Sequence, residues 1–310
     1  MCGIAGLIHR DGNGSIGQEM SAMLMALRHR GPDSTGYGLY GTPNDGRLVM
    51  RLKLAETEEV QSGYAIHGEI EKRAAMVAER LDELGAKIIE TASPTEYARR
   101  YTFTYDGDMT KLANWVQSEH VEILSIGHAL ELVKDLGGAD QVAGLYDLGS
   151  FQGTHAIGHT RMATESDVDI ASAHPFWAFP YNDVAVVHNG QLTNFWTFRR
   201  RLERKGHKFY SNCDSELIAV YISDRMDQGD TLEEAMHRSV YELDGVFTYL
   251  VTTSDSLGMA KDTMAAKPMV LYEDNQFVAL ASEEVAIRSV FPHEIDTSDP
   301  YDEEVRVWHR

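Results

Sequence analysis

The chain has only two cysteines, Cys2 and Cys213, among its 310 residues. Two cysteines cannot build the disulfide framework of a small secreted domain, and their scarcity is typical of a reducing compartment. No apolar run reaches the roughly 20 residues that a membrane-spanning helix needs. The N-terminus also lacks the charged and apolar regions of a signal peptide. We therefore expect a cytoplasmic protein.

Basic residues are scarce as well, because 28 Lys and Arg stand against 48 Asp and Glu, for a net charge of -20. Nucleic acid and anionic membrane surfaces repel such a chain, so neither is expected as a partner. The strongest basic run, Arg199, Arg200 and Arg201 with Arg204 and Lys205, lies on a predicted helix. It is interpreted as a solvated face or a contact with another protein.

The pattern of apolar residues predicts strands and helices in separate blocks. A chain of this length can bury a full core in one large domain or two. The separate blocks of strands and helices favour stacked sheets flanked by helices, an α+β fold, over a Rossmann sheet. No Gly-rich phosphate loop occurs. Strands are predicted at 2–8, 37–54, 156–161, 184–188, 246–252, 269–272 and 277–281, and helices at 16–27, 194–205, from 214 onward and at 232–243.

Residues 55–150 differ from the rest of the chain in the pattern of their apolar residues, and they carry no catalytic motif. Apolar spacing predicts helices at 69–84 and 129–136, with strands near 87–89, 101–105 and 121–126. We interpret 55–150 as an inserted α/β subdomain of unknown role within a domain that spans 1–310.

The second residue carries the strongest chemical signal. If Met1 is removed, Cys2 has both a thiol and a free α-amine. A thiol becomes a good nucleophile only as a thiolate. An α-amine has a reference pKa of about 7.7–8.0, so it can accept the thiol proton and return it to a leaving amine. The alternative is a buried, inert cysteine, which is common in protein cores.

Four polar clusters accompany Cys2. They read HRGPDSTG at 29–36, GHTRMAT at 158–164, VHNGQL at 187–192 and NCDSEL at 212–217. Each also has an ordinary structural interpretation. Asn-Gly often forms a turn, Asp214 and Glu216 can stabilise a helix N-terminus, and Arg161 can form a surface ion pair. Their common order after an N-terminal cysteine calls for one explanation.

With these motifs in this order, the chain resembles the class II glutamine amidotransferases of the N-terminal-nucleophile hydrolase superfamily. The resemblance covers 1–54 and 151–290 and extends through 173–175, 261–262, 266–268 and 281–283. It implies a four-layer αββα fold. The chain departs from the family where Met162 stands in place of a frequent Trp, and where Glu165-Ser166 replace a frequent His-Gly.

The resemblance also implies a role for each matching residue. Cys2 would attack the side-chain amide of glutamine, giving a γ-glutamyl thioester and ammonia, with Asn189 and the N–H of Gly190 as the oxyanion hole. Arg161 would hold the substrate α-carboxylate, and Asp214 the α-ammonium. Thr164 and His174 would shape the pocket, and Arg30 would brace the strand that begins near Cys2.

Glutaminases of this class deliver ammonia to a synthase, and no acceptor module is recognisable in this sequence. We therefore expect a hetero-oligomer in which this chain resembles the glutaminase subunits of glutamate synthase-type systems, including N-methylglutamate synthase. A flavin would then belong to the partner subunit, and no cofactor or metal is expected in this chain. The helix at 194–205 and the insertion are the predicted docking surfaces.

Three alternatives remain open at this point. The chain could be another N-terminal-nucleophile hydrolase that cleaves a different amide, although Arg161 and Asp214 suit an amino-acid head group. It could be a non-catalytic glutamine-binding or regulatory subunit, which retention of Met1 would favour. A metal site at His155 and His159 is the third, but no third ligand is evident. Cys213 is interpreted as a packed thiol.

Overall fold

The computed structural model describes residues 2–43, 46–56, 59–60, 65–162 and 170–310. The strands in this part of the chain are β1 (Gly3–His9), β2 (Ser34–Tyr40), β3 (Leu48–Lys53), β4 (Lys87–Ala92), β5 (Ala98–Thr104), β6 (Glu122–Gly127), β7 (Leu130–Leu136), β8 (His155–Arg161), β9 (Phe176–Trp177), β10 (Ala185–Leu192), β11 (Gly245–Thr252), β12 (Ser256–Lys261), β13 (Val270–Glu273), β14 (Phe277–Ala281) and β15 (Val305–His309). The α-helices are α1 (Ile16–Ala26), α3 (Ala65–Glu83), α4 (Met109–Val116), α5 (Ala139–Leu145), α6 (Phe195–Arg204), α7 (Asp214–Asp227), α8 (Leu232–Glu242) and α9 (Glu284–Arg288), with single 3₁₀ turns at Arg28–Arg30 and Leu148–Ser150.

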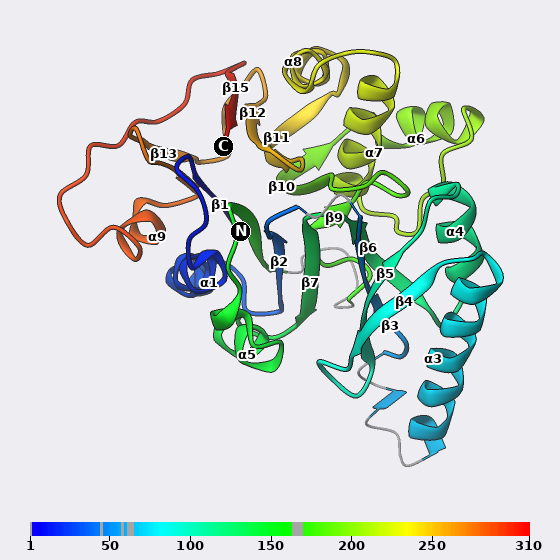
Figure 1. The fold of residues 1–310 in the computed structure, drawn as a ribbon. Helices are drawn as coiled ribbons and strands as arrows, with labels where there is room; N and C mark the ends of the chain where they lie inside the picture. The colour runs from blue at the N-terminus through cyan, green and yellow to red at the C-terminus, as the bar shows by residue number, and fades with distance from the viewer. Residues whose placement is uncertain (1, 44–45, 57–58, 61–64, 163–169) are drawn as a thin grey trace.

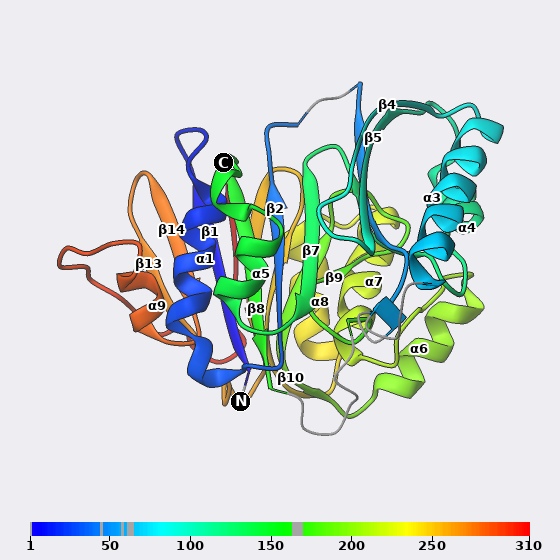
Figure 2. The same ribbon diagram turned by 90° about the horizontal axis from the view of Figure 1, so that it is seen from below.

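Two stacked sheets form the centre of the molecule (Figures 1 and 2). The first has six strands in the order β13-β14-β1-β8-β2-β7, and the second has five in the order β15-β12-β11-β10-β9. Strands β1 and β8 of the first sheet contact β10 and β11 of the second. Helices α1, α5 and α9 cover the outer face of the first sheet, and α7 and α8 cover the second. The result is the α+β, four-layer arrangement expected from the sequence.

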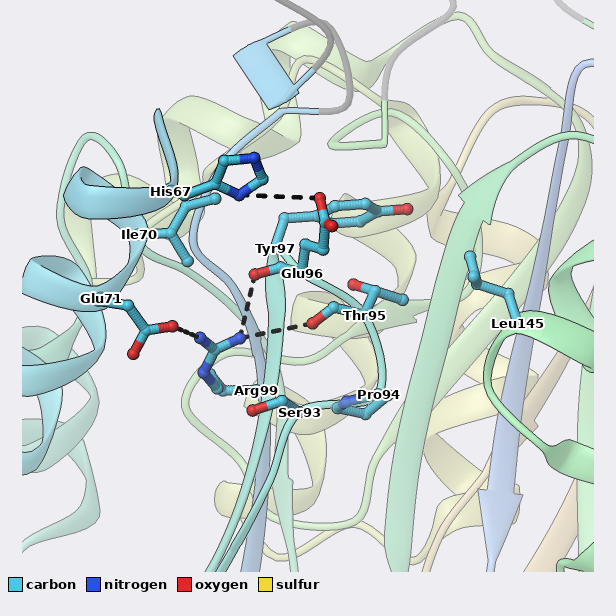
Figure 3. Close-up of a pocket in the computed structure, with 10 residues that line it drawn as sticks. All are labelled: His67, Ile70, Glu71, Ser93, Pro94, Thr95, Glu96, Tyr97, Arg99 and Leu145. Carbon is cyan, nitrogen blue, oxygen red and sulfur yellow. Dashed lines mark hydrogen bonds and ion pairs between the residues drawn. The ribbon is translucent and has the colours of Figure 1, made fainter. Parts of the chain in front are cut away.

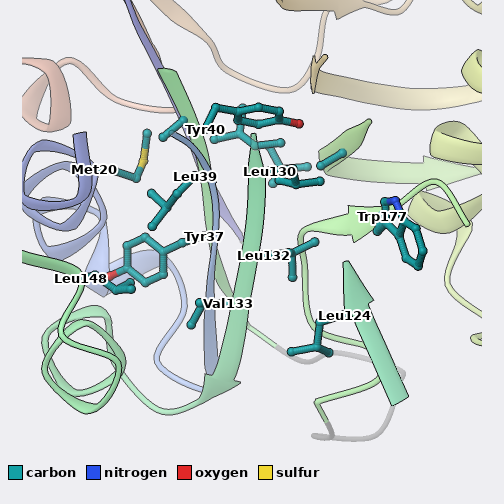
Figure 4. Close-up of a cluster of buried hydrophobic side chains, with 14 of the residues drawn as sticks. Met20, Tyr37, Leu39, Tyr40, Leu124, Leu130, Leu132, Val133, Leu148 and Trp177 are labelled. Atoms are coloured by element: carbon teal, nitrogen blue, oxygen red, sulfur yellow. The ribbon is translucent and has the colours of Figure 1, made fainter. Parts of the chain in front are cut away.

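The core strands are buried on both faces, because each sheet has a helix layer on one side and the other sheet on the opposite side. In β2, Tyr37 and Leu39 are fully buried on the side of α1 and Met20, as Figure 4 shows. In β7, Val133 points to that same side, whereas Leu132 points the other way. Successive side chains of a strand alternate between faces, so such strands are apolar almost without interruption.

The insertion forms a third sheet of four strands, in the order β4-β5-β3-β6. Helix α3 packs against β4 and α4 on the outside of the molecule (Figure 1). The bounds of this sheet, 48–127, differ from the 55–150 expected. Strand β3 belongs to it, whereas β7 and α5 belong to the core.

The helix predicted at 129–136 is wrong. These residues form β7, which pairs with β2 from Ser34↔Leu136 to Tyr40↔Leu130. Leu130, Val133 and Leu136 do match helical spacing, but the backbone hydrogen bonds of a sheet ladder override that local pattern. The strands expected together at 37–54 are β2 and β3, which lie in different sheets.

Within the described residues, none of the helices is both long enough and apolar enough to cross a membrane.

Candidate active site

The backbone of Cys2 is held from both central sheets. Its carbonyl oxygen accepts one hydrogen bond from Nε of Arg30, at 3.0 Å, and another from Nδ2 of Asn189, at 3.2 Å. Arg30 follows α1 on the six-stranded sheet, while Asn189 lies in β10 of the five-stranded sheet. The N-terminal nucleophile predicted from the sequence therefore sits where the two sheets meet.

Arg30 is itself fixed by an ion pair. The guanidinium is 8% exposed, and its Nη1 lies 2.5 Å from Oε1 of Glu283 at the start of α9. Burial would raise the pKa of Glu283, but the hydrogen bonds and charges of Arg30 and His29 lower it below its usual value. This pair ties the segment after α1 to the end of the sheet, beside Cys2.

The Cys2 side chain lies beside the end of β8. Its Sγ is 3.8 Å from the carbonyl oxygen of Met162, one residue beyond Arg161, the last residue of β8. The Arg161 side chain is buried, at 5% exposure. A Cβ on Gly31 would come within 2.3 Å of the Arg161 carbonyl carbon, so the Arg-Gly-Pro loop packs directly on this strand end.

Asn189 and Gly190 lie inside a strand and do not form a turn. They pair with Thr248 and Phe247 of β11 in an unbroken antiparallel register. Gly190 has φ of 152°, and a Cβ there would lie 2.1 Å from the Val246 carbonyl oxygen. Only glycine suits this backbone conformation and this close approach. The glycine of this Asn-Gly pair is therefore required by the close packing of β10 at position 190.

Asp214 is the first residue of α7, and its carboxylate is oriented by the strand that carries Asn189. Oδ2 accepts the backbone N–H of Leu192 at 2.8 Å, and Oδ1 lies 3.6 Å from Nδ1 of His188. Burial raises the pKa of Asp214, but the electrostatic attraction of His188 and the hydrogen bond from the Leu192 N–H outweigh it, so the pKa is lowered. An ionised carboxylate thus lies against β10, the strand that carries Asn189 and Gly190.

Glu216, two residues further along α7, has a structural role. Its carboxylate accepts the backbone N–H groups of Tyr210 and Ser211, each at 2.8 Å, and closes the loop that leads into the helix. Burial raises its pKa.

His174 lies among buried polar groups, and the sequence motifs assigned no role to two of these, His188 and Ser215. Its Nε2 is 2.6 Å from the hydroxyl of Ser215, and its ring stacks on His159 with centroids 4.0 Å apart. The same hydroxyl is 2.9 Å from Nδ1 of His188. The sequence offered one signal for these two residues, which is their position next to predicted site residues. His188 precedes Asn189, and Ser215 follows Asp214.

Three residues considered in the sequence analysis remain. Thr164 lies outside the described residues. Burial and the neighbouring Asp214 raise the pKa of the Cys213 thiol to about 12, and its side chain packs against the core, in keeping with the packed thiol expected from the sequence. His155 bonds the Thr253 carbonyl oxygen at 2.8 Å and the Thr154 hydroxyl at 2.8 Å, with its ring stacked on Tyr40. Both nitrogens of His155 therefore have structural partners.

A pocket of about 650 Å³ lies in the insertion, away from these groups (Figure 3). It is lined by α3, the β4–β5 connection and Leu145. Its buried guanidinium, Arg99, is paired with Glu71 at 2.5 Å and bonds the Glu96 carbonyl oxygen at 3.1 Å. None of the residues predicted for catalysis lines this pocket.

Comparison with known proteins places the chain in a family. Residues 159–289 match a family model described as "Glutamine amidotransferase domain". A protein of Methanothermobacter thermautotrophicus, described as "Putative glutamine amidotransferase", is 39% identical over 96% of this chain and 95% of its own length. The "Glutamine amidotransferase-like protein GlxB" of Rhizobium meliloti is 32% identical over 99% of this chain and 95% of its own length.

The solved structure of glutamine phosphoribosylpyrophosphate amidotransferase from B. subtilis has the same fold. It matches with a TM-score of 0.62 and 17% identity, over 99% of this chain and 47% of that chain. The present chain thus spans about half of that protein. This likeness confirms the α+β, four-layer fold. The two relatives that match over nearly their whole length show that this chain belongs to the glutamine amidotransferase family.

Proposed function

We propose that this chain is a class II glutaminase that hydrolyses the side-chain amide of glutamine through Cys2. The observation that carries the proposal is the double anchoring of the Cys2 carbonyl by Arg30 and Asn189. This anchoring would hold the thiol, and the α-amine that removal of Met1 would expose, between Arg161 at the end of β8 and Asn189 within β10.

The reaction would proceed by acyl transfer. The Cys2 amine takes the thiol proton, and the sulfur attacks the amide carbon of glutamine. The Asn189 amide has two N–H donors, so it can hold the Cys2 carbonyl and also stabilise the oxyanion together with the Gly190 N–H. The C–N bond breaks as the amine returns the proton to the departing ammonia. Water then attacks the thioester and releases glutamate.

Substrate selection would depend on the two charged groups beside this centre. The planar guanidinium of Arg161 suits bidentate binding of the α-carboxylate. The ionised Asp214 suits the α-ammonium. Thr164 and His174 would complete the pocket.

Ammonia release by the purified protein tests this proposal. We expect L-glutamine to yield equal amounts of glutamate and ammonia. Asn189→Ala should reduce turnover by roughly 10²–10³, the usual effect of losing one oxyanion donor. A processed protein that releases no ammonia above the buffer rate would contradict the proposal. It would favour a regulatory subunit instead.

The ammonia acceptor would lie on a synthase partner of the glutamate synthase type, with N-methylglutamate synthase as the most specific candidate and a flavin on the partner subunit.

The basic residues of the predicted docking helix, α6, fall into two groups. Arg199 bonds the Ser211 carbonyl oxygen at 2.7 Å and lies over the ring of Phe209 at 4.9 Å, so it braces the loop before α7. Arg200, Arg201 and Arg204 form the exposed basic face.

Binding of the partner provides a second test. Replacing Arg200, Arg201 and Arg204 together by Ala should weaken association with the synthase while Cys2 keeps its reactivity. Arg288→Ala on α9 is the control, since α9 covers the six-stranded sheet, whereas α6 packs on α7, the helix that covers the other sheet (Figure 1). Equal affinity of the triple variant and the control would exclude α6 as the docking surface.

A further inference from the structure

The hydroxyl of Ser215 joins three segments of the site. Ser215 is fully buried in the first turn of α7. Its Oγ lies 2.6 Å from Nε2 of His174, 2.9 Å from Nδ1 of His188 and 3.5 Å from Oδ1 of Asp214. No family role assigned above involves this residue, yet it touches the neighbours of both Asn189 and Asp214.

Two histidines near this hydroxyl lie deep in the protein. Burial lowers the pKa of His159 to about 3 and lowers that of His174 well below its usual value, with nearby positive charge acting in the same direction. A hydroxyl has one proton to donate and two sites that accept. Ser215 has one proton for three neighbours, the two rings of His174 and His188 and the Asp214 carboxylate, so at least one ring must donate to it. The hydroxyl therefore couples the hydrogen bonds of the two rings.

His188 is the residue that Ser215 controls most directly. Its Nδ1 lies 2.9 Å from the Ser215 hydroxyl but 3.6 Å from Oδ1 of Asp214, which is beyond a good hydrogen bond. While His188 is bonded to Ser215, that carboxylate oxygen keeps long contacts, 3.5 Å to the Ser215 hydroxyl and 3.9 Å to Sγ of Cys213. Without the hydroxyl, a small shift would bring His188 into a direct hydrogen bond with Asp214.

We propose that Ser215 is a positioning residue that keeps His188 off Asp214, so that the carboxylate can bind the α-ammonium of the substrate. The inference rests on the proposed glutaminase function and adds the residue that makes the site selective for α-amino amides. Ser215 itself would touch neither the substrate nor the reacting atoms.

Kinetics with two substrates test this inference. For Ser215→Ala, we expect KM for L-glutamine to rise about 10-fold, with kcat within about 3-fold of wild type. Glutaramate, which lacks the α-amino group, should be hydrolysed with unchanged kcat/KM. The preference for glutamine over glutaramate should thus fall about 10-fold, whereas a purely structural defect would lower both activities alike. Ser215→Thr, which keeps the hydroxyl, should restore the preference.

The outcomes separate this inference from the proposed function. If wild-type protein releases no ammonia from glutamine, the glutaminase proposal fails, and this inference fails with it. If the wild type is active and Ser215→Ala keeps its preference for glutamine, only the role of Ser215 is overturned. Should Ser215→Ala not fold, Ser215→Cys, which keeps the volume with a weaker donor, replaces it under the same criteria.

Discussion

The two central sheets and the sheet of the insertion are held by different kinds of contact. Around Cys2, backbones approach so closely that no side chain fits between them. A Cβ on Gly36 would lie 1.9 Å from the His174 carbonyl oxygen, just as one on Gly190 would collide with Val246. The insertion instead joins the core through buried charges. Glu131 of β7 bonds Arg51 of β3 and Arg100 of β5, in each case with 2.8 Å contacts.

A second set of charges makes the same connection. Glu122 of β6 lies 2.9 Å from Lys53 of β3 and 3.5 Å from Lys134 of β7. Buried ion pairs add little net stability but are costly to break, since the remaining partner keeps an uncompensated charge. The comparison indicates that steric fit fixes the two central sheets near Cys2, whereas paired charges fix the orientation of the insertion.

The largest effect on stability should come from breaking the charged junction. Glu131→Ala leaves Arg51 and Arg100 facing a buried space, so we expect the free energy of unfolding to fall by about 3–5 kcal/mol. Urea denaturation measures the change. Glu90→Ala removes an exposed partner 3.5 Å from Arg100 and should cost at most about 1 kcal/mol. Equal losses for the two variants would show that the junction does not depend on its buried charges.

A smaller effect is expected from adding one methyl group to the six-stranded sheet. Gly36→Ala would push β2 away from the His174 backbone and should cost about 1–3 kcal/mol, the usual range for overpacking. Because His174 bonds Ser215, kcat/KM for glutamine should fall as well. Thermal unfolding and ammonia release would both be measured. If the Gly36→Ala protein is destabilised but keeps its activity, the close packing of β2 against the His174 backbone does not influence the site.

The same substitution in the insertion should have the smallest effect and the opposite sign. Gly68 lies exposed in α3, and a Cβ there would meet no atom within 4 Å. Gly68→Ala should therefore stabilise the protein by about 0.5–1 kcal/mol through helix propensity. A loss of stability would mean that the surface of α3 is more constrained than its contacts indicate. Measuring the thermal unfolding of Gly68→Ala and Gly36→Ala side by side compares the two regions directly.

Much of the fold could be predicted because the central strands are apolar on both faces. The predictions near β1, β8, β10, β11 and β14 are confirmed within a few residues. Strand β7 was missed because its neighbour in the sheet, β2, is about 100 residues away, and spacing within one segment cannot reveal such pairing. The insertion bounds shifted for the same reason.

The site was predictable to the extent that its residues fall in contiguous motifs. Cys2, Arg30 and Asn189 are joined by hydrogen bonds. The hydrogen bonds of Ser215 to His174 and His188 come from three segments, so no local pattern could indicate them. Arg199 appeared to be part of a charged face, but its long side chain turns inward to the loop before α7.

The central claim is tested most directly by the intact mass of the purified protein before and after treatment with 6-diazo-5-oxo-norleucine, a glutamine-shaped electrophile. Peptide mapping would locate the adduct, with Cys2→Ala as control. We predict a chain that has lost Met1 and carries one adduct, on Cys2, and no adduct in the control. A chain that keeps Met1 and gains no adduct would contradict the account and indicate a binding or regulatory subunit.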